Sequence, residues 1–99
     1  MNIYSVTKMK TYPETKYFTS KRKCMNYLEK AMGHAPAAAD VRTDKITERR
    51  CLYGEELQNA LKGNWEFSEI CFYERTASRG LYLNPYEIIE LVIDDENDI

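Results

Sequence analysis

The sequence predicts an α+β fold in which a small antiparallel sheet, built from two hairpins, is covered by helices on one face. Three observations support this prediction. Two segments rich in β-branched and aromatic residues each divide at a turn, as hairpins do. Stretches with apolar residues at three- and four-residue steps come after them along the chain. The chain has 99 residues, of which 43% are hydrophobic and 30% charged, so it can close one core, and we expect residues 1–99 to form a single domain.

The first hairpin and helix are expected over residues 3–33. Residues 3–7 are β-branched and aromatic, a turn with Pro13 follows, and residues 15–19 have the composition of a returning strand. Ser20 is placed to cap a helix, and Gly33 is placed to end it. The apolar positions of this helix recur at helical spacing, and they are Cys24, Met25, Leu28, Ala31 and Met32.

The middle of the chain is harder to assign. Residues 34–53 fit a loop, a helical turn or an extended segment, and we leave them open. A short helix is expected to begin at Gly54, because two glutamates follow in the first turn, where they favour the helix dipole. Leu57, Ala60 and Leu61 give it an apolar side, and Gly63 closes it.

The last third predicts a second hairpin and a final helix. Residues 65–76 are aromatic and partly alternating, residues 77–80 form a turn, and residues 81–83 complete the hairpin. The segment Asn84-Pro85-Tyr86-Glu87 combines three helix start signals. A helix is therefore favoured, with Ile88, Ile89 and Val92 as its apolar stripe and Glu87, Glu90 and Asp94 on the opposite side. The residues Ile89, Leu91 and Ile93 also alternate as in a strand, and this alternative stays open.

Charge is divided unevenly along the chain. Residues 1–50 hold eleven Lys or Arg and five Asp or Glu, whereas residues 51–99 hold three and eleven. An acidic face is expected near the carboxy terminus, formed by Glu87, Glu90, Asp94 and Asp95, and residues 94–99 are expected to fray. Such a face can occupy a basic, nucleic-acid-binding cleft of another protein by imitating phosphates.

A basic cluster opens the first predicted helix. Lys21, Arg22 and Lys23 lie in its first turn, where cations oppose the helix dipole. Exposed amides together with three cations attract a phosphate, a nucleic-acid backbone or an acidic protein surface, and Arg49 and Arg50 can extend the same surface. The simpler interpretation, which we favour, is a solvated helix start whose small unfavourable dipole interaction is tolerated. Nucleic-acid binding by the basic amino-terminal half is thus the alternative function.

The residue inventory argues against an enzyme, a metal and a cofactor. His34 is the only histidine and follows a helix-ending glycine, so a nucleophile has no obvious base. Cys24, Cys51 and Cys71 lack the short spacing of zinc ligands, and no glycine-rich phosphate loop occurs. No apolar run approaches a membrane span and no export signal begins the chain, so we expect a cytoplasmic protein. A second copy can pair with an exposed sheet edge, which leaves a homodimer open.

Three stretches of the first third carry a resemblance. Ile3-Tyr4-x-Val6-Thr7, Phe18-x-Ser20-Lys21-x-Lys23 and Tyr27-Leu28 together resemble the opening of short bacteriophage and prophage proteins. This resemblance implies a compact protein that acts in the host cytoplasm by binding a host protein, including immune or nucleic-acid-processing complexes, as anti-CRISPR inhibitors do. The sequence thus predicts a non-enzymatic interaction protein that inhibits or modulates a host protein through a charged surface.

Overall fold

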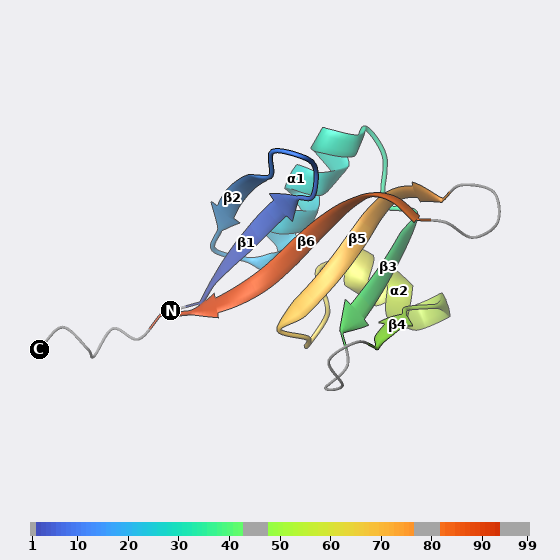
Figure 1. Cartoon of the computed structure of the whole chain (residues 1–99). Coiled ribbons are helices and arrows are strands. Elements are labelled where there is room, and N and C mark those ends of the chain that lie inside the picture. Colours follow the sequence, from blue (N-terminus) through green and yellow to red (C-terminus); the bar gives the residue numbers. More distant parts are fainter. Residues whose placement is uncertain (1, 43–47, 77–81, 94–99) are drawn as a thin grey trace, which may run out of the picture.

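The computed structural model describes residues 2–42, 48–76 and 82–93 (Figure 1). Two helices are present in this part of the chain, α1 (Lys21–Met32) and α2 (Gly54–Leu61). The strands are β1 (Asn2–Lys8), β2 (Glu14–Phe18), β3 (Ala38–Arg42), β4 (Arg49–Cys51), β5 (Glu69–Thr76) and β6 (Tyr82–Val92).

All described strand pairs are antiparallel and belong to one six-stranded sheet, in the order β2-β1-β6-β5-β3-β4. Strand β6 is 11 residues long and pairs with β1 on one side and with β5 on the other. It therefore joins the first hairpin to the rest of the sheet, and it runs through the middle of the molecule in Figure 1.

The predicted fold class is wrong, because this sheet is larger than two hairpins and dominates two short helices. The final helix expected from Asn84 onward is instead most of β6, and residues 34–53 contribute β3 and β4. Asn84 does not cap a helix: it has a φ of 56°, and its side-chain amide donates to Glu74 at 2.8 Å. Pairing along both sides of β6 satisfies its backbone, and this long-range pairing outweighs the local start signals.

The local predictions for the first hairpin and both remaining helices are confirmed. Strands β1 and β2 pair with Tyr4 opposite Phe18. The Ser20 hydroxyl accepts a hydrogen bond from the Lys23 amide at 3.1 Å and so caps α1, and Gly33 ends it in the left-handed conformation at a φ of 81°. Helix α2 begins at Gly54, as the acidic first turn indicates.

One core lies between the sheet and the helices. Strand residues such as Val6, Phe72 and Ile88 pack in the same cluster as Leu28 of α1 and Ala60 of α2, so both helices cover the same face (Figure 1). Because side chains alternate along a strand, the neighbours of these residues point to the other side. No described helix covers that second side, which we call the helix-free face. Neither described helix, α1 with 12 residues nor α2 with 8, could span a membrane.

Candidate functional site

The helix-free face carries a row of small and polar residues that crosses five strands. The strand register places Thr7 of β1 opposite Glu87 of β6, Glu87 opposite Cys71 of β5, and Cys71 opposite Asp40 of β3. Asp40 in turn lies opposite Cys51 of β4. Cross-strand partners share a face, and the flanking residues of Asp40 belong to the core, so this row lies on the uncovered side.

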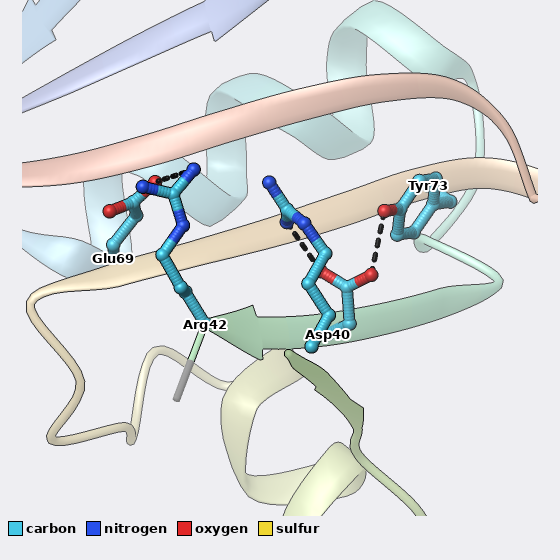
Figure 2. Close-up of polar contacts among 5 residues, drawn as sticks. Asp40, Arg42, Glu69 and Tyr73 are labelled. Atoms are coloured by element: carbon cyan, nitrogen blue, oxygen red, sulfur yellow. Dashed lines mark hydrogen bonds and ion pairs between the residues drawn. The ribbon is translucent and has the colours of Figure 1, made fainter. Parts of the chain in front are cut away.

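Asp40 is the centre of the polar contacts on this face. Its side chain is only 7% exposed, and it accepts hydrogen bonds from the Arg49 guanidinium at 3.0 Å and from the Tyr73 hydroxyl at 2.7 Å (Figure 2). Two residues after Asp40 in β3, Arg42 forms an ion pair with Glu69 of β5 at 3.6 Å. We call these five residues the Asp40 cluster. Both oxygens of the buried carboxylate are used, so the cost of burying its charge is offset.

Burial and charge set the protonation of the groups around Asp40. Burial acts to lower the pKa of Arg49, but the hydrogen bond and charge of Asp40 outweigh it and raise that pKa. Burial, together with the hydrogen bond to Asp40, raises the pKa of the Tyr73 phenol well above its usual range. Burial also raises the pKa of the Cys71 thiol to about 11. At neutral pH the thiol and the phenol therefore keep their protons.

A second aromatic group adjoins the cluster. The ring of Tyr82 lies 4.9 Å from that of Tyr73, and a hydrogen bond with Cys51 raises the pKa of Tyr82 to about 12. Cys51 and Cys71 are both free, and β3 separates their strands, so their Cα atoms are about 10 Å apart, too far for a disulfide. In the described part of the chain, no group of three or more potential ligands could hold a metal.

The predicted acidic residues do not share a face. Glu87 and Glu90 are three positions apart in a strand, so their side chains point to opposite sides of the sheet. Glu87 belongs to the row on the helix-free face, whereas Glu90 pairs with Tyr4 and accepts a hydrogen bond from Asn2 at 2.9 Å. Asp94, Asp95 and the expected frayed tail over residues 94–99 lie outside the described residues.

The predicted basic cluster makes contacts within the protein. The Lys21 ammonium donates to the Trp65 carbonyl, and Arg22 donates to the Lys62 carbonyl at 3.1 Å. Lys23 donates to the Thr19 hydroxyl at 3.2 Å. The first two contacts tie the start of α1 to the segment after α2, which offsets the unfavourable placement of cations at a helix start.

The open hollow beside Lys21 has a volume of about 580 Å³. Glu56 and Glu66 both line it, which makes it a poor site for a phosphate. Arg49 and Arg50 separate, because Arg49 joins the Asp40 cluster while Arg50 forms two bonds to Glu56 of α2, at 2.7 and 3.2 Å. Each of the five predicted cations is therefore engaged by a hydrogen bond or ion pair within the protein.

Sequence reasoning missed the Asp40 cluster because its central residue lies in the segment left unassigned. One signal was present: Asp40 interrupts an apolar run, Ala37-Ala38-Ala39-Asp40-Val41, and a carboxylate in such a run needs a partner. A second was the alternation of Glu69, Cys71 and Tyr73 with apolar residues, which places them on one face of a strand.

Comparisons with protein-family models, with curated proteins and with solved structures found no match for this chain.

Proposed function

We propose that the protein is a non-enzymatic binding protein that recognises a partner protein through the helix-free face of its sheet. The other face is already covered by α1 and α2. Toward one end, the helix-free face presents Ile3 opposite Leu91, with Ile89 and Tyr17 on the neighbouring row. Tyr17 is 64% exposed and Leu91 is 40% exposed. Uncovered apolar and aromatic side chains on one face are typical of protein interfaces.

The observation that carries this proposal is a pair of arginines held in place on that face. Arg42 and Arg49 lie directly opposite each other across β3 and β4, where like charges repel. Each is fixed by a carboxylate, Arg42 by Glu69 and Arg49 by Asp40, yet their side chains remain 48% and 40% exposed. A guanidinium held in one conformation loses little entropy on binding, and arginine is enriched among the residues that dominate interface affinity.

The chemistry of the face supports binding over catalysis. A nucleophile attacks in its deprotonated form. The raised pKa values of Cys71 and Tyr73 keep both groups protonated, and Asp40 is already occupied by two donors. These three groups are thus suited to contribute packing surface and hydrogen bonds to an interface.

The class of partner comes from the resemblance of the first third to phage proteins. It implies a host protein, with inhibition or modulation as the consequence of binding. The acidic-face version of this hypothesis is weakened, because Glu87 and Glu90 diverge. Arg42 and Arg49 are charged groups that the partner would meet on this face, so we expect acidic residues opposite them on its surface.

Affinity capture from a bacterial lysate tests this proposal. The tagged protein is incubated with nuclease-treated and untreated halves of the lysate, and bound proteins are identified by mass spectrometry. Two variants on the helix-free face, Arg42→Glu and Leu91→Glu, are compared with Lys62→Glu, which reverses an exposed charge just after α2. We expect a stoichiometric partner that survives nuclease, binds Lys62→Glu normally, and binds the two face variants at least about tenfold more weakly.

Other outcomes overturn it. A partner retained equally by all variants would place the interface elsewhere. Binding that disappears with nuclease would favour the nucleic-acid alternative, and capture of no stoichiometric protein by the unaltered chain would remove the support for a host partner.

A further inference from the structure

Strand β2 leaves a row of backbone groups unpaired at the edge of the sheet. In an antiparallel ladder, the backbone groups of successive residues point alternately to the two neighbouring strands. The Met9 amide, just after β1, donates to the Pro85 carbonyl of β6 at 2.9 Å. The backbone groups of odd-numbered residues in β1 therefore point to β6, and those of even-numbered residues point to β2. In the β1–β2 register, even-numbered residues of β2 lie opposite even-numbered residues of β1, so their backbone groups bond to β1. The backbone groups of Thr15 and Tyr17 therefore point away from the sheet. No described strand pairs with β2 on that side.

A groove runs beside this edge on the helix side of the sheet. Its volume is about 520 Å³, its surface is mostly apolar, and Phe18 of β2 contributes to it together with one stripe of α1. The rings of Phe18 and Tyr27 lie 5.3 Å apart in it. The remaining lining residues are Lys23, Asn26 and Lys30. The groove thus combines aromatic rings with two ammonium groups.

The charge of this groove is not balanced within the described part of the chain. No carboxylate lines the groove, and none of the ion pairs among the described residues involves Lys23 or Lys30. The one acidic residue of β2, Glu14, is engaged by Lys10 at 3.3 Å. A ligand with carboxylates spaced along an apolar segment would therefore complement both the rings and the lysines.

We propose that β2 and α1 form a peptide site that takes an extended acidic segment of a partner protein by strand addition. The segment pairs with the outward backbone groups of Thr15 and Tyr17 as a seventh strand. Every second side chain of the segment then faces the groove, where apolar ones contact the Phe18 and Tyr27 rings and acidic ones approach Lys23 and Lys30. A nucleic acid shares the negative charge but lacks the alternating donors and acceptors that continue a sheet. This site lies at the edge next to α1, apart from the Asp40 cluster, and does not depend on it.

Fluorescence anisotropy with a defined probe tests the site. The probe is a fluorescein-labelled heptapeptide of sequence Glu-Thr-Val-Thr-Val-Thr-Glu, in which the acidic and apolar residues share one face of the strand, and a peptide with lysine at each acidic position is its control. We expect saturable binding of the acidic peptide alone. The variant Thr15→Pro removes an outward amide, whereas Thr15→Val keeps that amide and removes only the hydroxyl bond to Thr7. Affinity is expected to fall at least about tenfold in the proline variant and to change less than about twofold in the valine variant.

Three further arms keep the proposal falsifiable even if Thr15→Pro folds poorly. An acidic peptide N-methylated at alternate residues cannot pair with the edge, so it should bind at least about tenfold more weakly in one methylation phase. The double variant Lys23→Glu/Lys30→Glu should lose binding, and Lys62→Glu should retain it. Amide shifts in NMR spectra should concentrate in β2 and α1.

Equal binding of methylated and unmethylated peptides, or of acidic and basic peptides, would overturn the proposal. Shifts confined to the helix-free face would do the same. Displacement of the peptide by oligodeoxythymidylate with no effect of N-methylation would assign the groove to nucleic acid instead.

Discussion

The two edges of the sheet are finished in different ways. At one edge, β4 is only three residues long, and each of its arginines forms an ion pair, Arg49 with Asp40 and Arg50 with Glu56. At the other edge, β2 has five residues, and the lysines of the adjoining groove have no carboxylate partner in the described part of the chain. Short edges and charged residues protect a sheet from pairing with other chains. The comparison indicates that the β4 edge is closed by structure-forming contacts and the β2 edge is available for binding.

This difference also separates two roles of positive charge. A cation that already holds a buried carboxylate contributes to folding, and removing either partner leaves the other without compensation. A cation without such a partner contributes little to folding and is open to a ligand. Stability measurements can therefore distinguish the two edges before any partner is known.

The largest expected effect is at the β4 edge. Replacing Asp40 by Ala leaves the Arg49 guanidinium and the Tyr73 hydroxyl without their acceptor, so the free energy of unfolding should fall by about 2–3 kcal/mol. Urea denaturation of the two proteins measures this difference. Glu69→Ala is the matched control, because its ion pair with Arg42 is longer and more exposed, and it should cost less than about 1 kcal/mol. Equal losses in the two variants would mean that burial of Asp40 has no structural importance.

Stability at alkaline pH tests how well water is excluded from two buried thiols, one beside the Asp40 cluster and one in α1. Burial raises the pKa of Cys71, beside the Asp40 cluster, and of Cys24, in α1, from 9.0 to about 11. Between these values the unfolded chain has lost thiol protons that the folded chain keeps. The unfolded state then binds fewer protons, so stability should fall as pH rises from 9 to 11, by at least about 1 kcal/mol in total.

Urea denaturation at several pH values, repeated on Cys71→Ala and Cys24→Ala, assigns this loss. Each variant should show a shallower fall than the unaltered protein over the same range. A fall that neither substitution reduces would mean that both thiols ionise as readily in the folded protein as in the unfolded chain.

The start of α1 gives the next effect, on the β2 side. Ser20→Ala removes the side-chain acceptor for the Lys23 amide and should lower the free energy of unfolding by about 1 kcal/mol. Thermal or urea denaturation measures this change. Ser20→Gly should cost only a few tenths of a kcal/mol, since glycine at this position leaves the amide open to water. If the alanine and glycine variants were equally stable, the cap would not support this helix.

Helix α1 could be predicted because its determinants are close together in the sequence. The Ser20 cap, the apolar stripe and the Gly33 terminus lie within one short segment, and each acts on its own neighbours. Strand β6 was predicted only in part: the alternation of Ile89 and Leu91 left a strand open, but the choice of strand over helix depends on β1, at the other end of the chain. Its start signals at Asn84 and Pro85 are real local preferences that distant pairing overrides.

The candidate site was hidden for the same reason. Asp40 and Tyr73 are 33 residues apart, and their contact exists only because β3 pairs with β5. The lysines of the groove were partly visible, since Lys23 belongs to the predicted basic cluster. Its partner in the groove, Lys30, lies seven residues later on the same side of the helix, but Phe18 completes the groove only when β2 folds beside α1.

The smallest expected effect on stability is at the β2 edge, and it tests the comparison most directly. The double variant Lys23→Gln/Lys30→Gln removes both charges from the groove and disturbs only the exposed bond of Lys23 to Thr19, so stability should change by less than about 0.5 kcal/mol. Arg49→Gln should cost more, because it leaves Asp40 buried beside a weaker donor. Urea denaturation at low and high salt measures both. If the lysine variant loses as much stability as Arg49→Gln, its cations are structural, and the β2 edge is closed in the same manner as the β4 edge.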